Sequence, residues 1–166
     1  MSEMTSGMTR KLFLEVCMGI EGLCADLYHC YSKMYDDVPE ASDLWKKTAL
    51  EEENHQKQFA LAFRLMKEAE FEVPKDSLKR AYVIHHKLLN LIDHVKNNKP
   101  DLLSAVSKAV EMEGKLADLH VHTALNFKEE SMQKLFKSLS EADCGHVSDL
   151  ERFRTILCLP HSEMDG

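Results

Sequence analysis

The two halves of this chain repeat one pattern of acidic and histidine residues. Residues 20–28 read IEGLCADLY and residues 112–120 read MEGKLADLH, with five of the nine positions identical. An acid-x-x-His motif follows in each half at a matching distance, so the whole pattern recurs after about 90 residues. Its members are Glu21 and Glu52-x-x-His55 in the first half, and Glu113 and Asp143-x-x-His146 in the second. Such a repeat predicts two equivalent helical hairpins around a pseudo-two-fold axis.

Helical periodicity places the repeated residues on the apolar faces of four helical segments. We expect these segments at about 9–35, 42–71, 101–127 and 129–157, with Ser42 as the N-cap of the second and a frayed stretch before the first. On the second segment, Glu51 and Glu53 point about 100° to either side of Glu52 and can be solvated. Glu52 itself faces the core, so a carboxylate is expected where burial is strongest.

The links between the segments predict how the helices are arranged. A short turn after the first segment makes the second antiparallel to it. The longer connection, about 72–100, carries its own helical pattern and can travel the length of a bundle, so that the third segment runs parallel to the second. The sequence therefore predicts an all-α fold: a four-helix bundle over about 9–157 with a helix-containing crossover, in one domain spanning 1–166.

Composition narrows the class of protein. Only six glycines and four prolines occur, as expected for long helices with few turns. The net charge of -7, without any basic run, argues against a nucleic-acid binder. The apolar run after Lys11 is interrupted by Glu15, which is typical of neither a signal peptide nor a membrane span. The five cysteines form no Cys-x-x-Cys pair and suggest reduced thiols, so a cytoplasmic location is expected.

Four carboxylates in one bundle core need compensating positive charge. Each would cost several kcal/mol to desolvate and would repel the others. No Lys or Arg lies near the middle of an apolar helix face to neutralise them. Two divalent cations would neutralise them, and carboxylates with one imidazole per metal suit iron or manganese. The predicted metal ligands are Glu21, Glu52, His55, Glu113, Asp143 and His146. The alternative is that the carboxyls are partly protonated and hydrogen-bonded to Tyr28, Tyr31 or His120 and to water.

On these residues the chain resembles the rubrerythrin-like branch of the ferritin-like diiron proteins, over about residues 10–157. The resemblance implies a ferritin-like bundle with two iron ions, or manganese, in which Glu52 and Asp143 bridge the metals at the reacting centre. Glu21 and Glu113 would be terminal ligands, and each histidine would bind one metal. Tyr28 would hydrogen-bond a ligand carboxylate. His120, at the matching place in the second half, would do the same or bind metal itself, and we favour the first role.

The chain also departs from rubrerythrins at three places. It lacks the cysteine pairs of a rubredoxin-like domain, so electrons are expected from a separate donor protein. Leu116 stands where rubrerythrins carry an additional glutamate. Asp143 replaces a glutamate that is one methylene longer, and the neighbouring Gly145, unfavourable in a helix by about 1 kcal/mol, would allow a local distortion that brings Asp143 within reach.

The function expected from the resemblance is that of an iron oxidoreductase, which reduces hydrogen peroxide or oxidises Fe(II) with oxygen or peroxide. A non-catalytic ferritin-like module for metal binding, storage or sensing is the second reading. A metal-free helical interaction protein is the third. The resemblance also allows a homodimer, although the sequence shows no distinct interface stripe.

Overall fold

A computed structural model describes residues 2–65 and 71–160, with side chains from residue 6 onward. Within these residues it contains α-helices and no β-strand. The helices are α1 (Ser2–Met34), α2 (Pro39–Leu65), α3 (Ser77–Asn97), α4 (Leu102–Asn126) and α5 (Glu130–Cys158). The all-α prediction is therefore confirmed.

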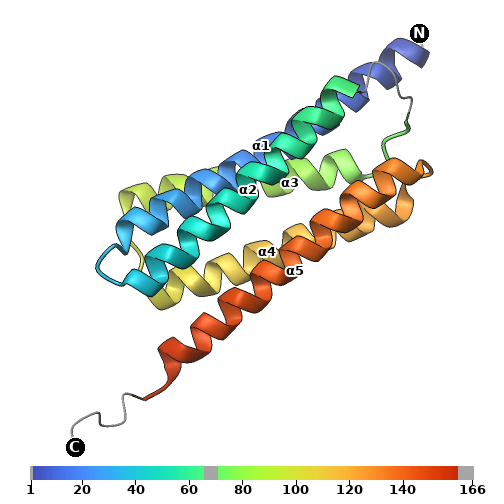
Figure 1. Cartoon of the computed structure of the whole chain (residues 1–166). Helices are drawn as coiled ribbons and strands as arrows, with labels where there is room; N and C mark the ends of the chain where they lie inside the picture. The colour runs from blue at the N-terminus through green and yellow to red at the C-terminus, as the bar shows by residue number, and fades with distance from the viewer. Residues whose placement is uncertain (1, 66–70, 161–166) are drawn as a thin grey trace, which may run out of the picture.

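The helices form two antiparallel hairpins with α3 beside them (Figure 1). α1 packs along α2, and α4 packs along α5, as the repeat in the sequence predicts for its two halves. α3 packs mainly on α1 and less extensively on α4. It runs from the end of the molecule where α2 stops to the opposite end, where α4 starts, and α2 and α4 point the same way (Figure 1).

Two helices begin earlier than the sequence predicted. α1 starts at Ser2 instead of near Thr9, because elongating a helix that has already formed costs little per residue. α2 starts at Pro39 instead of Ser42, since the fixed φ and the missing N–H of proline suit a first helical turn. Ser42 bonds to α1 instead of capping α2: its Oγ donates to the carbonyl of Ser32 at 2.8 Å, and Ser32 Oγ donates back at 2.9 Å.

Other helix ends agree with the sequence or differ for a local reason. α4 follows Asp101, whose side chain accepts a hydrogen bond from the Ser104 N–H at 2.8 Å. The second helix was predicted to reach Phe71, which is buried but not helical, while residues 66–70 lie outside the described part. α5 is helical through Gly145, and Asp143 is buried within this helix.

Two groups of aromatic residues occupy the core on either side of the bundle centre. The tyrosine-rich cluster lies toward the α1–α2 turn and contains Tyr28, Tyr31, Tyr35 and Trp45. The phenylalanine-rich cluster lies toward the opposite end and contains Phe13, Phe59, Phe71, Phe127 and Phe136. Along α1, Glu21 lies between Phe13 and Tyr28, and along α2, Glu52 lies between Trp45 and Phe59. The centre of the bundle is thus closed by hydrophobic side chains at both ends.

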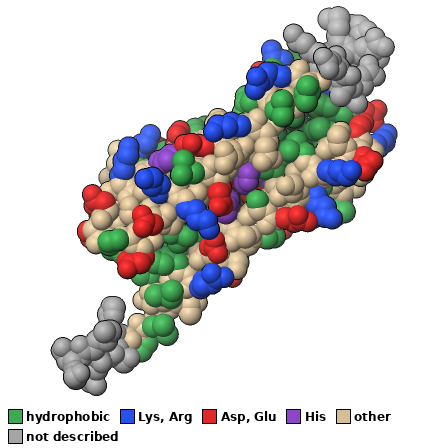
Figure 2. Space-filling view, in the orientation of Figure 1, with side chains coloured by type: hydrophobic (Ala, Val, Ile, Leu, Met, Phe, Trp, Pro, Cys, Tyr) green, Lys and Arg blue, Asp and Glu red, His purple; other side chains and the backbone are tan. Residues whose placement is uncertain are grey.

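The outer surface is strongly charged, with acidic and basic side chains interspersed along α2 and α5 (Figure 2). No helix in the described ranges combines the length and the apolar character needed to cross a membrane. Histidine side chains also reach this face, in the seam between α2 and α5 (Figure 2).

Candidate metal centre

Each helix of the two hairpins places one carboxylate at the centre of the bundle. The four side chains are fully buried, at 0 % exposure: Glu21 on α1, Glu52 on α2, Glu113 on α4 and Asp143 on α5. Each of these acids lies near the middle of the apolar face of its helix. When the four apolar faces pack together, their middles meet at the centre of the bundle. His55 and His146, one helical turn beyond the acids of α2 and α5, are also buried. The structure thus brings all six predicted ligand residues into one carboxylate–histidine cluster.

The possible ligand atoms of this cluster fall into two groups that share one residue. Within each group, one nitrogen or oxygen atom per residue lies within 4.8 Å of those of the others. The first group is Glu21, Glu52 and His55, and the second is Glu52, Glu113, Asp143 and His146. Glu52 belongs to both groups. Asp143, the other residue predicted to bridge, belongs to the second group.

Both histidines turn Nδ1 toward the carboxylates. Nδ1 of His55 lies 3.2 Å from Glu52 Oε2 and 3.5 Å from Glu21 Oε2. Nδ1 of His146 lies 2.9 Å from Glu52 Oε1 and 3.3 Å from Glu113 Oε2. The centroids of the two imidazole rings are 5.9 Å apart, and the ring planes make an angle of 29°. Each group therefore holds one imidazole nitrogen facing several carboxylate oxygens.

A residue that sequence reasoning assigned to solvent contacts the cluster from outside. Oε2 of Glu51 lies 2.6 Å from Nε2 of His146, on the ring edge that faces away from the other carboxylates. Glu51 itself is partly exposed, and Lys47 approaches it at 4.0 Å. A carboxylate behind a ligand histidine fixes the ring and its tautomer. Helix periodicity within α2 gives no signal for this contact, because it depends on how α5 packs against α2. Ala142 occupies the equivalent place in the second half.

Tyr28 and His120 contact the cluster differently although they match in the repeat. The Tyr28 hydroxyl donates a hydrogen bond to Oε1 of Glu113, across the two hairpins. Nδ1 of His120 lies 2.6 Å from Oδ2 of Asp143, within its own hairpin, and its Nε2 lies 3.4 Å from Oε1 of Glu21. The structure thus places both residues against carboxylates of the cluster, where the sequence expected them.

Burial and mutual repulsion disturb the protonation of the carboxylates. Burial, reinforced by the charge of Glu52, raises the pKa of Glu21 well above its ordinary value and that of Glu113 to about 7. Burial also acts to raise the pKa of Glu52, but hydrogen bonds from His146 and His55 outweigh it and lower that pKa. Burial acts to lower the pKa of His146, but its hydrogen bonds to Glu113 and Glu52 outweigh burial and raise that pKa to about 11.

The donor set could hold metal ions. In the described part of the chain, histidines are the only cationic side chains within ion-pair distance of the four acids. Among these residues no side chain outside the carboxyl groups donates a hydrogen bond to Glu21 or to Oδ1 of Asp143, whereas one proton shared between Glu21 and Glu52 would join those two carboxyls. Tyr28 and His120 bond to other oxygens of the cluster, as the protonated alternative requires. Buried oxygens without partners, facing imidazole nitrogens, are suitable ligands for a divalent cation.

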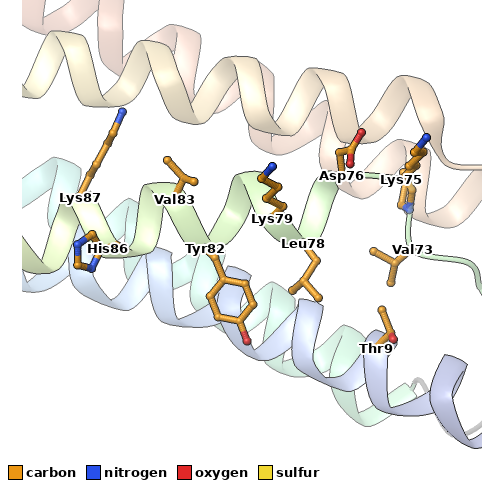
Figure 3. Close-up of a pocket in the computed structure, with 11 residues that line it drawn as sticks. Thr9, Val73, Lys75, Asp76, Leu78, Lys79, Tyr82, Val83, His86 and Lys87 are labelled. Carbon is orange, nitrogen blue, oxygen red and sulfur yellow. The ribbon is translucent and has the colours of Figure 1, made fainter.

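A separate groove lies on the surface between α1 and α3, with a volume of about 800 Å³ (Figure 3). Among its lining residues, Leu78 and Tyr82 point from α3 toward α1, whereas Lys79 and Lys87 point away from α1 (Figure 3). Its lining includes no residue of the carboxylate–histidine cluster. The cluster is therefore an interior site of the bundle, distinct from this groove.

Comparison of the chain with protein-family models, with curated proteins and with solved structures found no match. The class of protein is therefore defined by the fold and the site alone. Together they describe a helical bundle with a buried glutamate–histidine cluster that can hold metal ions.

Proposed function

We propose that the carboxylate–histidine cluster holds two iron ions and that the chain is a rubrerythrin-like oxidoreductase, which reduces hydrogen peroxide or oxidises Fe(II). Glu21, Glu52 and His55 would hold one ion. Glu113, Asp143 and His146 would hold the other, with Glu52 shared between them. The observation that carries the proposal is this sharing, because a carboxylate common to two ligand groups is what a dinuclear site needs.

The donors suit iron or manganese better than zinc or copper. Each group offers one imidazole and otherwise carboxylates, a set that suits iron or manganese and lacks the thiolates that favour zinc or copper. A bound pair of such ions supplies two electrons to an oxidant, the number that reduction of peroxide requires. Manganese in the same positions would direct the site toward catalase-like chemistry.

The protein's own residues would exclude water, orient ligands and hold a proton. The two aromatic clusters close the site at both ends of the bundle. Tyr28 and Glu51 bond to Glu113 and His146 and so hold two ligand side chains in place. Glu113, with a pKa of about 7 in the metal-free protein, is able to hold or release a proton near neutral pH. The cysteines are dispersed along the chain, so reducing electrons would come from a separate donor protein.

Metal content is the first test. Protein purified without added metal and then titrated anaerobically with Fe(II) should bind two irons per chain. Glu52→Gln should lose both ions, because it removes the shared carboxylate charge. Glu53→Gln is the matched control, since Glu53 lies next in sequence but pairs with His29 at 2.6 Å, outside the cluster. A Glu52→Gln variant that binds iron like the wild type would refute the proposed site.

Turnover is the second test. The iron-loaded protein should be oxidised by hydrogen peroxide and should return to the reduced state with a one-electron reductant over repeated cycles. Leu116, fully buried and apolar where rubrerythrins carry a glutamate, favours one specific alternative: a metal-binding module without peroxidase activity. Two irons per chain with no peroxide consumption above that of Glu52→Gln would support that module and overturn the enzyme.

A further inference from the structure

Helix packing closes three of the four sides of the bundle. Within the hairpins, α1 packs along α2 and α4 packs along α5. α3 covers the side between α1 and α4, with Ala81, Ile84 and Leu88 buried in the core. The fourth side lies between α2 and α5, and no helix of the described residues lies over it (Figure 1). We call this side the seam, and at the level of the cluster its residues are Lys47, Glu51 and His55 on α2 with His146 and Asp149 on α5.

Polar contacts join the two helices across the seam at the level of the cluster. Oε2 of Glu51 lies 2.6 Å from Nε2 of His146, and Nζ of Lys47 lies 3.3 Å from Oδ2 of Asp149. The side chains of Lys47, Glu51 and Asp149 are 61 %, 42 % and 36 % exposed, so water reaches each of them. Exposed ion pairs add little to stability, so these contacts can open without unfolding the bundle.

Apolar side chains close the interior on either side of this level. Phe59 of α2 and Phe136 of α5 are fully buried, with ring centroids 5.4 Å apart. On the other side, Trp45 of α2 and Leu150 of α5 are fully buried in the tyrosine-rich cluster. Opening the bundle at either place would expose apolar surface to water, whereas opening the polar contacts exposes little. The polar part of the seam is therefore the least costly way from solvent to the cluster.

His55 stands just inside this part of the seam. Its ring stacks against that of His146, with centroids 5.9 Å apart, and its side chain is 8 % exposed. Its Nδ1 lies 3.2 Å from Glu52 and 3.5 Å from Glu21, both of which are fully buried. An ion that arrives through the seam would therefore meet His55 before it meets these two acids.

A positive charge already lies between two carboxylates at the mouth of the seam. The ammonium nitrogen of Lys47 is 3.3 Å from Oδ2 of Asp149 and 4.0 Å from Oε1 of Glu51. Arg152 contacts the other oxygen of Asp149 at 3.7 Å. The lysine group thus marks a position that attracts cations. It does so on a flexible, exposed stem that can withdraw into water.

We propose that divalent cations reach and leave the cluster through the seam. An arriving cation displaces the ammonium group of Lys47 from Glu51 and Asp149, and then passes inward to His55. A divalent ion can compete with the lysine because it carries the larger charge, and the displaced ammonium group remains hydrated. Lys47 therefore acts as an exchangeable plug, and Glu51 is the carboxylate that receives the ion. The inference rests on the proposed function, because it assigns the route by which the ions of that site enter.

The first test measures the rate of metal uptake with Co(II), whose bound form absorbs visible light. Stopped-flow mixing with the metal-free protein gives the association rate, and a chase with EDTA gives the dissociation rate. Lys47→Gln should raise the association rate several-fold, and Glu51→Gln should lower it several-fold. Lys46→Gln, exposed on the same helix, and Glu53→Gln, on a carboxylate that pairs with His29, change the net charge equally and should have no such effect. High salt should reduce the differences, because these charges are exposed.

The second test fills the seam. Ala142 is the counterpart of Glu51 in the repeat, so the two-fold relation places it toward His55, and it is partly buried. Ala142→Phe should slow Co(II) association and release together and leave the number of bound ions unchanged. Ser148→Phe, at an exposed position of the same helix, should change neither rate. A damaged site would alter the affinity, whereas a blocked route alters both rates and not their ratio.

The number of bound ions separates the two ways in which the inference can fail. Full Co(II) binding with unchanged association rates in Lys47→Gln, Glu51→Gln and Ala142→Phe would overturn the route and leave the proposed function standing. A wild type that binds neither Co(II) nor Fe(II) would overturn the proposed function, and the route with it.

Discussion

Oδ2 of Asp143 lies 2.6 Å from Nδ1 of His120, within one hairpin, whereas the residue matching His120 in the repeat bonds across to the opposite hairpin. The repeat is thus not symmetric in its hydrogen bonds. One oxygen of Asp143 is taken by His120, and the other is left without a partner in the described part of the chain. This arrangement suits a short carboxylate that is oriented by one oxygen and binds with the other.

Removing His120 should weaken metal binding without removing an ion. In His120→Ala the orientation of Asp143 is lost, and losses of about 10- to 100-fold in affinity are typical for such supporting residues. Anaerobic Fe(II) titration measures both stoichiometry and affinity, and His122→Ala on the same helix is the control. A stoichiometry of one iron per chain in His120→Ala would instead identify His120 as a ligand.

Removing Glu51 should weaken the metal position that contains His146. Without the carboxylate at Nε2, the ring is free to rotate or to change tautomer, so Glu51→Ala should lower the affinity for one of two ions by about 10- to 100-fold. Glu53→Ala should leave both affinities unchanged, since Glu53 contacts His29. Nitrogen NMR of the His146 imidazole provides a readout independent of metal, and an identical spectrum in Glu51→Ala would contradict the positioning role.

The metal-free protein should lose stability as the pH rises from 5 to 8. Glu113 keeps its proton up to about pH 7 when folded, but releases it near 4.5 when unfolded. Between these values the folded state binds more protons, so the free energy of unfolding falls with rising pH, by up to about 3 kcal/mol. His146, with a folded pKa of about 11, adds a further decline above its usual 6.5. Urea unfolding at several pH values measures this slope.

Glu113→Gln should flatten that slope and stabilise the metal-free protein at pH 8, because the amide cannot ionise. The same variant should bind iron more weakly. Glu111→Gln, an exposed neighbour paired with Lys108 and Lys115, should change neither property. Bound metal should reverse the trend, since cation binding displaces protons and strengthens as the pH rises. A metal-free wild type that is more stable at pH 8 than at pH 5 would contradict the buried carboxylate cluster.

Glycine-to-alanine substitutions should distinguish helix positions where an added Cβ has space from positions where it meets another side chain. A Cβ at Gly114 or Gly145 would meet no atom within 4 Å, so alanine at either position should raise the free energy of unfolding by about 0.5 to 1 kcal/mol. A Cβ at Gly22 would lie 2.5 Å from Nε2 of Gln56, which must move, so Gly22→Ala should bring no gain. Thermal unfolding checks all three. Loss of iron affinity in Gly145→Ala would show that this position needs conformational freedom after all.

The helices and the meeting of the six cluster residues followed from the sequence because periodicity acts locally. An acid in the middle of an apolar helix face must point into the core, whichever helix packs against it. The meeting of Glu21 and Glu113 could therefore be predicted without knowledge of any interhelical contact. The start of α2 could not be placed as well, because Pro39 and Ser42 both suit a helix start and only the bonds of Ser42 to α1 decide between them.

The partners behind the cluster could not be predicted for a different reason. Glu51 lies off the apolar face of α2, and its contact with His146 depends on the spacing and rotation of α5. The direction of the His120 bond likewise depends on the distance between α4 and α5 at that level. Such contacts require interhelical geometry, which the pattern within a single helix does not contain.

Among the described residues, the carboxylate that contacts Nε2 of His146 has no counterpart at His55, because Ala142 stands at the place equivalent to Glu51 and offers no polar side-chain atom. If the cluster holds two metal ions, the one at His146 would have a ligand ring oriented at both nitrogens, and the one at His55 would not. We expect the ion near His146 to stay through many cycles and the ion near His55 to exchange with solution. The two copies of the motif would then differ in role: the copy with His146 would retain its ion, and the copy with His55 would take up and release the exchanging ion.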